Sequence, residues 1–296
     1  MAGGWQVAAL VVAAVAASTR AVIVDLSYTY NVDAPNSPRV TPFSHKIVKK
    51  GPNKINIWQE VNDFCASEHS GTHLDAPINF AQHGWSTEAI PLSRLWRVPA
   101  VVVDVSGPIK NAQDKNYEVK VRDLEQWESD HGTIPDGALV LFRTGWAKKV
   151  KNIRDFAGLD QHNTLNFPGI GKGAAEWLAR HASRHSYQKG VVGVGIDTLS
   201  LDKGQTVRFP AHVALYQHNI YGLENLANLD KLPATGSYVT VMPLKIGGGS
   251  GSPARVIGEV DEAPPGASPA GTLLHSAYIL PCLLIITLLA HWPLNA

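Results

Sequence analysis

The residues best suited to chemistry lie between Glu68 and Pro77. Two histidines, His69 and His73, and the carboxylate of Asp75 fall within seven positions of one another. Imidazole and carboxylate groups are ligands that Zn²⁺ and Mn²⁺ accept, at about 2.0–2.2 Å. If the segment is helical, the two imidazoles face the same way, and a break before Pro77 brings the carboxylate in. A polar surface turn is the alternative interpretation of the H-x-x-x-H spacing alone.

A second pair of possible ligands, His212 and Glu224, follows later in the chain. Taken singly, the first is an ordinary histidine of an amphipathic helix and the second a carboxylate at a helix N-terminus. Together with the first cluster they supply enough nitrogen and oxygen donors for two ions. Two ions about 3.5–4 Å apart suit the hydrolysis of amides and esters. The combination therefore favours a metal centre over two unrelated polar segments.

At this point the sequence resembles the cyclase-like metal-dependent hydrolases, the family of bacterial-type kynurenine formamidase and isatin hydrolase. The family pattern is H-x-G-T-H-x-D-x-P-x-H, followed by D-T-x-S-x-D and H…E-N-L elements. The resemblance extends over residues 22–260. The matching positions are His69, Gly71, Thr72, His73, Asp75, Pro77, Arg143-Thr144-Gly145-Trp146, Asp197-Thr198-Leu199-Ser200-Leu201-Asp202, His212, Glu224-Asn225-Leu226 and Asn228-Leu229.

The resemblance implies a swivelling three-layer β/β/α fold of the α/β class and a homodimer. It also implies that His69, His73 and Asp75 bind a first metal ion, and that Asp75 bridges to a second ion held by His212 and Glu224. One or two ions per subunit are expected. The donor set does not choose between zinc and manganese.

One position departs from the family pattern. The final histidine, which accepts or donates a proton in the family, is replaced by Asn79. An asparagine amide has no useful pKa, but it can donate a hydrogen bond to a carbonyl or tetrahedral oxyanion. His83, four residues further on, is a candidate substitute base, and an exposed loop histidine is the alternative.

The resemblance implies hydrolysis of an amide C–N bond by metal-bound hydroxide. Two reactions are of this kind. One is the arylformamidase reaction of tryptophan catabolism, which converts N-formylkynurenine to kynurenine and formate, and the other is the opening of an isatin-like cyclic amide. Trp58, Trp85 and Trp146 are candidates for the wall of a site for a small aromatic amide, although core packing is the commoner role of tryptophan. The alternative is a cell-surface binding protein that keeps the metal site and has lost turnover, as the loss of the family histidine would allow.

Composition and patterning fit a single enzyme domain. The chain has 296 residues, 45% of them hydrophobic, and a formal net charge of +1, with no basic stripe that would indicate a nucleic-acid partner. Apolar runs predict strands, and helical spacing predicts two helices among them, an order typical of a layered α/β fold. The predicted strands are 21–26, 54–61 (half-buried), 100–105, 137–146, 190–197, 238–243 and 254–257, and the predicted helices are 122–131 and 171–184.

Both ends of the chain have the composition of processing signals. Residues 1–21 are typical of a secretory signal peptide, and residues 22–260 form the expected domain. Residues 261–296 combine a Pro/Gly linker with an apolar run, Ala277 to Ala290, that favours a glycosylphosphatidylinositol (GPI) signal over a transmembrane helix. A lipid anchor at the extracellular face of the plasma membrane is therefore expected. Cys65 is the one cysteine outside the tail, and we expect it to be buried as a small hydrophobe.

Overall fold

The computed structural model describes residues 21–183 and 190–261, and one compact unit comprises Ile23–Val260. All but the last residue of the predicted signal peptide (1–21) and all but the first residue of the predicted linker and GPI signal (261–296) lie outside the described residues, and both stay predictions. Release of the protein from intact cells by a phosphatidylinositol-specific phospholipase C would test the anchor. Among the residues described, no helix is long and apolar enough to cross a membrane.

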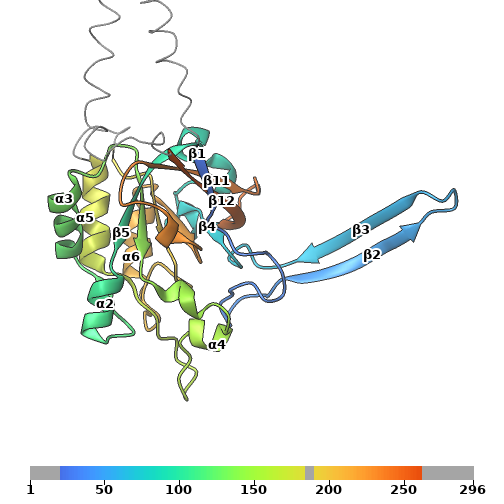
Figure 1. Cartoon of the computed structure of the whole chain (residues 1–296), viewed down its shortest axis with the longest axis horizontal. Coiled ribbons are helices and arrows are strands. Elements are labelled where there is room, and N and C mark those ends of the chain that lie inside the picture. Colours follow the sequence, from blue (N-terminus) through green and yellow to red (C-terminus); the bar gives the residue numbers. More distant parts are fainter. Residues whose placement is uncertain (1–20, 184–189, 262–296) are drawn as a thin grey trace, which may run out of the picture. The chain divides into compact units, whose positions relative to one another are not determined.

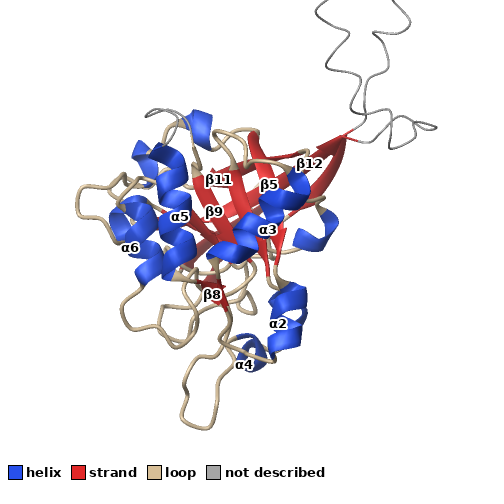
Figure 2. Cartoon of the chain, turned by 90° about the vertical axis from the view of Figure 1, so that its left-hand side faces the viewer, coloured by secondary structure: helices blue, strands red, loops and turns tan. Residues whose placement is uncertain are grey.

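A sheet of eight strands forms the centre of the unit (Figures 1 and 2). Its order is β1 (Ala21–Asp25), β12 (Gly251–Asp261), β11 (Ser237–Pro243), β5 (Val98–Asp104), β7 (Leu139–Arg143), β9 (Gly193–Ile196), β10 (Tyr221–Glu224) and β4 (His73–Asp75). Strands β5, β7, β9 and β10 run parallel, whereas β4, β11 and β12 pair antiparallel with their neighbours. Because β12 also pairs with β4, with Gly251 opposite Asp75, the sheet curls back on itself.

Helices cover one face of this sheet, and the curled strands cover the other. Along β5, Val101 and Val103 belong to the core that faces the helices, whereas Ala100 and Val102 belong to the core on the opposite face. This alternation is what a strand buried on both faces requires. The result is the predicted three-layer β/β/α arrangement, which is confirmed.

The remaining elements are short or lie outside the main sheet. The helices are α2 (Ser106–Ala112), α3 (Val121–His131), α4 (Ile153–Phe156), α5 (Lys172–Ser183) and α6 (Pro210–Tyr216), with 3₁₀ turns at Pro77–Asn79, Thr87–Ala89, Leu92–Arg94, Trp146–Lys149 and Leu229–Lys231. Strands β6 (Glu118–Val119) and β8 (Gly169–Ile170) pair with each other. The two predicted long helices, α3 and α5, are present within one residue of their expected bounds.

Strands β2 (Ser44–Pro52) and β3 (Trp58–Cys65) form a hairpin that extends away from the sheet in Figure 1. The prediction of a half-buried strand at residues 54–61 is wrong, because every residue of β3 is exposed. Alternating residues normally place one face on a core, but no layer formed by residues 21–183 or 190–261 covers either face of the hairpin. The prediction that Cys65 is buried is wrong for the same reason, since it ends β3 and is exposed.

Candidate metal centre

The first cluster of predicted ligands is held by a strand and not by a helix. His73 and Asp75 are the two ends of β4, and alternate residues of a strand point to the same face. The helical i,i+4 geometry that the spacing would allow is therefore not formed, although the side chains still converge. His69 precedes a turn in which Gly71 has a φ of +66°, a conformation that favours glycine. Tyr30 lies so close to Gly71 that a Cβ there would sit 2.8 Å from the tyrosine ring.

The second cluster reaches the same place from two other elements. His212 lies on α6, and Glu224 ends β10, which pairs with β4 so that Glu224 stands opposite His73. The alternative interpretation of Glu224, a carboxylate at a helix N-terminus, is wrong, because the residue belongs to strand β10. His73 Nε2 lies 3.3 Å from Glu224 Oε2 and 3.2 Å from Asp75 Oδ1. His212 Nε2 lies 3.1 Å from Glu224 Oε1 and 3.5 Å from Asp75 Oδ2.

All five predicted ligands therefore meet in two groups that share Asp75. In each group the ligand atoms lie within 4.8 Å of one another, and the members are His69, His73 and Asp75 in the first and Asp75, His212 and Glu224 in the second. Except for His69, which is partly exposed, these side chains are buried. Two ion positions bridged by one carboxylate are the geometry that the sequence resemblance implies.

Each imidazole of the centre has one nitrogen tied to a protein acceptor and the other turned to the carboxylates. His73 Nδ1 lies 3.0 Å from the Gly71 carbonyl oxygen, and His212 Nδ1 lies 2.6 Å from Asp202 Oδ2. His69 Nε2 is 3.0 Å from Ser250 Oγ, which itself donates to Glu68. Such second partners fix the tautomer and leave the other nitrogen free to bind a metal ion.

The surroundings of His73 Nε2 show whether a cation fits this site. The atom is buried and has no hydrogen-bond partner of acceptable geometry, although two carboxylates lie within 3.3 Å of it. Buried carboxylates require a compensating cation, and an unpartnered buried nitrogen is costly. A divalent ion at this position would satisfy the nitrogen and the carboxylates together, so the residues present fit such an ion.

Without an ion, protons provide the compensating charge. Burial lowers the pKa of His73, but the carboxylates of Asp75 and Glu224 outweigh it and raise the pKa to about 10. The pKa of His212 is likewise raised, against burial, by Asp202, Asp75 and Glu224. Burial acts to raise the pKa of Asp75, yet the three imidazoles hold it well below its usual value.

Ion binding is therefore expected to release protons at neutral pH. Because the pKa of His73 in the metal-free protein lies above 7, its imidazole is protonated there, and a metal ligand must be neutral. Titration calorimetry with Zn²⁺ in buffers of different ionisation enthalpy counts the protons released. Ion binding should also weaken as the pH is lowered. Binding without proton release at pH 7 would contradict this charge arrangement.

Two residues to which the sequence analysis assigned no role complete the surroundings of the ligands. Tyr216 donates a hydrogen bond of 2.9 Å to Asp75 Oδ2. Asp202 accepts from His212 and from the backbone N–H groups of Ala211 and His212. The signals were present: Tyr216 is four residues from His212, on the same helix face, and Asp202 ends a motif of the family.

A cavity of about 220 Å³ opens on the ligands. Asn79 lines it and donates to Asp75 Oδ2 at 3.2 Å, whereas the other predicted catalytic residue, His83, is exposed and does not line it. The cavity residues are Ser37, Arg39, Val40, His69, Asp75, Asn79, Leu165, Phe167, Leu199, Ser200, Lys203, Gly204, Thr206, Phe209, His212 and Glu224.

The three tryptophans predicted to wall the site do not line this cavity. Trp58 lies on the exposed hairpin, and Trp85 packs under the guanidinium of Arg94. Trp146 is buried in a cluster with Phe167 and stands behind the cavity wall. The loop that carries Trp146 is held by Asp197, whose carboxylate accepts hydrogen bonds from Thr144 and Gly145.

Comparison with known proteins places these features in a family. The Cyclase family model matches residues 24–203. Isatin hydrolase of Roseibium aggregatum is 34% identical over 251 residues, which cover 77% of this chain and 89% of that protein. Kynurenine formamidase of Bacillus cytotoxicus is 27% identical over 236 residues, 79% of this chain and 95% of the relative.

Solved structures agree with the sequence relatives. Isatin hydrolase A from Ralstonia solanacearum superposes with a TM-score of 0.73 at 33% identity, covering 86% of this chain and 97% of that one. An isatin hydrolase bound to the product analogue thioisatinate gives a TM-score of 0.73 at 29% identity, covering 87% and 99%. The chain belongs to the Cyclase family, as the sequence predicted.

Proposed function

We propose that this protein is a metal-dependent hydrolase that cleaves the C–N bond of a small aromatic amide. The observation that carries the proposal is the convergence of five buried or half-buried candidate ligands from β4, its preceding turn, β10 and α6, of which all but His73 line one cavity. The relatives are named for hydrolysis of isatin and of a kynurenine formamide, which supports an amide carbonyl as the target. No specific observation favours a binding protein without turnover.

The residues of the site would bind the metal ions or orient the ligands, according to their position. His69, His73 and Asp75 would hold one Zn²⁺ or Mn²⁺ ion, and Asp75, His212 and Glu224 a second. A bound divalent ion supplies a Lewis acid for the amide carbonyl and lowers the pKa of water towards neutrality. Tyr216 and Asp202 keep Asp75 and His212 in place.

Asn79 can form hydrogen bonds but cannot act as an acid or a base at neutral pH. Its Nδ2 points at the shared carboxylate and lies at the cavity, where it can bind the oxyanion that forms during attack on a carbonyl. Because an asparagine amide does not exchange a proton at neutral pH, the proton for the leaving nitrogen comes from a group other than Asn79.

Steady-state hydrolysis of N-formylkynurenine and of isatin tests the proposal. The domain of residues 22–260 would be stripped of metal, reloaded with Zn²⁺ or Mn²⁺ and assayed with each compound. Turnover that needs the ion is the expected result, and the ratio of kcat/KM values identifies the preferred carbonyl. Full ion occupancy with no hydrolysis of either compound, or of simple formanilides, would contradict it.

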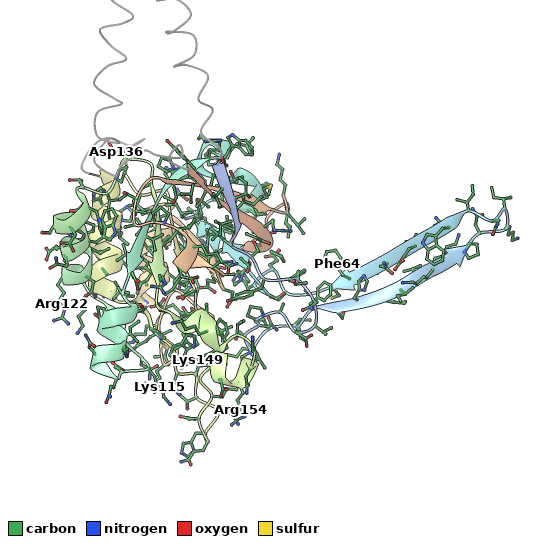
Figure 3. The ribbon with its side chains drawn as sticks, viewed as in Figure 1. Phe64, Lys115, Arg122, Asp136, Lys149 and Arg154 are labelled. Carbon is green, nitrogen blue, oxygen red and sulfur yellow. The ribbon has the colours of Figure 1, made fainter. Side chains whose placement is uncertain are left out.

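We also propose that the protein is a homodimer whose contact includes the β2–β3 hairpin. A two-stranded hairpin is at best marginally stable alone in water, and this one exposes a run of large apolar side chains. They are Ile47, Val48, Ile55, Ile57, Trp58, Val61 and Phe64, with Ile55 75% and Trp58 63% exposed. Only Phe64, labelled in Figure 3 near the base of the hairpin, packs on other rings, those of Tyr30 and Phe43.

Charging the hairpin is expected to separate the two copies. In light scattering coupled to size exclusion, the parent protein should have twice the mass of one chain, and the double variant Ile57→Asp/Trp58→Asp the mass of one. Val207→Asp changes a loop residue that is 85% exposed outside the hairpin and serves as the matched control. A parent protein of single-chain mass, or a hairpin variant that stays dimeric, would contradict the proposal.

A further inference from the structure

The candidate cavity differs in charge between its two ends. Its inner end carries the acidic ligands Asp75 and Glu224, which are buried. Among the residues that line it, the two permanently cationic side chains are Arg39, which is exposed, and Lys203, which is half-buried. Burial therefore places the metal ligands at the floor and a pair of cations at the rim.

The two cations are not equivalent. Lys203 Nζ lies 3.4 Å from Glu118 Oε2, so a protein carboxylate already offsets its charge. The guanidinium of Arg39 makes no ion pair or hydrogen bond with any residue that the structure describes. Only its backbone N–H is bonded, to Ser37 Oγ at 3.3 Å. A guanidinium presents a planar pair of donors that matches a carboxylate, and it stays charged at every physiological pH.

The walls between the two ends are apolar and close together. Leu165, Phe167 and Leu199 are almost fully buried, and the ring of Phe209 packs against that of Phe80 with centroids 5.1 Å apart and a tilt of 43°. The cavity volume of about 220 Å³ lies below the range of about 300–1,000 Å³ typical of drug-sized ligands. A ligand with one aromatic ring suits this space, and any substituent opposite the reacting amide would emerge at the rim.

We propose that Arg39 determines substrate specificity by binding a carboxylate at the end of the substrate remote from the reacting amide. The substrate class is then a one-ring aromatic amide with a negative charge, in preference to its uncharged counterpart. This inference rests on the proposed function, because it takes the metal ligands as the reacting end. Lys203 contributes less, since Glu118 compensates it. For a rim contact partly exposed to water, a preference of about 3- to 10-fold is expected.

Binding of a matched ligand pair tests this without turnover. The anion 4-acetamidobenzoate and the uncharged 4-acetamidobenzamide would be titrated calorimetrically into metal-loaded wild type, Arg39→Lys, Arg39→Gln and Arg39→Glu. Wild type should bind the anion more tightly, the lysine variant should keep part of that preference, and the glutamine variant should lose it. The glutamate variant should prefer the uncharged ligand. Raised salt should shrink the preference in wild type.

A surface variant and a second read-out separate the possible outcomes. Arg122→Gln, on α3 and labelled in Figure 3, removes an arginine that does not line the cavity and should leave the preference unchanged. An equal preference in wild type and Arg39→Gln would overturn the proposal, since the carboxylate would then bind elsewhere, for instance at the ions. No preference in wild type, or no binding of either ligand, would overturn it as well.

Failure of this inference is distinguishable from failure of the proposed function. Metal-dependent hydrolysis of formanilides with no effect of Arg39 on the charged member would refute the role of Arg39 alone. An Arg39-dependent preference in binding, with no hydrolysis of any amide, would support the anion site and refute the hydrolase.

Discussion

Replacing His73 with alanine is expected to lower the kcat/KM of the metal-loaded protein by at least about 10³-fold. His73 Nε2 lies within 3.3 Å of both carboxylates, so the substitution removes a buried nitrogen donor that faces Asp75 and Glu224 together. The expected loss exceeds the roughly 10–100-fold that removal of a residue orienting a ligand costs. Metal content measured on the same sample should fall with the activity.

A graded series makes this result specific. Asp202→Asn keeps every ligand but weakens the 2.6 Å contact that orients His212, so a loss of about 10–100-fold is expected. His162→Ala removes an exposed histidine that does not line the cavity and should leave both activity and metal content unchanged. If His73→Ala retained wild-type turnover, the assignment of the ligands would be wrong.

Replacing Asn79 with histidine is expected to raise kcat on a formanilide by about 10²-fold. The new imidazole would lie at the cavity where Asn79 now donates to Asp75, and general acid–base catalysis is typically worth about 10²–10⁴-fold. If the imidazole acts as a base, the gain should grow as the pH rises through its pKa, which is about 6.5 for an unperturbed histidine. A pH–rate profile from pH 5 to 8 measures this.

Asn79→Ala is the matched control for that substitution. It removes the amide donor without adding a titrating group, so kcat should fall below the wild-type value and no new pH dependence should develop. Equal rates for the asparagine, alanine and histidine proteins would show that this position takes no part in proton transfer or in binding the oxyanion.

The sequence predicted which side chains come together better than the way they are held. Residue types, spacing and the family resemblance singled out five candidate ligands, because metal binding restricts the choice to groups such as imidazole and carboxylate, and the structure brings these five together. The spacing left the local geometry at His69–Asp75 open, since an i,i+4 pair of histidines is equally compatible with a helix and with a turn entering a strand. The segment becomes a strand because it pairs with β10 and β12, which lie about 150 or more residues away in sequence.

The walls of the cavity and the exposure of the hairpin were harder to predict. Leu165, Phe167 and Leu199 come from connecting segments whose positions depend on the whole fold. The tryptophans were chosen for their type, but Trp146 is a support behind the wall and Trp58 lies on the hairpin. Alternation along residues 54–61 predicted one buried face, yet periodicity does not say whether the chain itself provides the covering layer.

The most direct test of the central claim is a stepwise metal titration of the stripped domain, with bound ion and amide hydrolysis measured on each sample. The proposed centre predicts that hydrolysis is absent without the ion, rises with occupancy and stops rising at one or two ions per chain. The same titration of His73→Ala should show weaker binding and no rise. Hydrolysis at the full rate by the metal-free domain, or an occupied centre with no hydrolysis at any stage, would contradict the account.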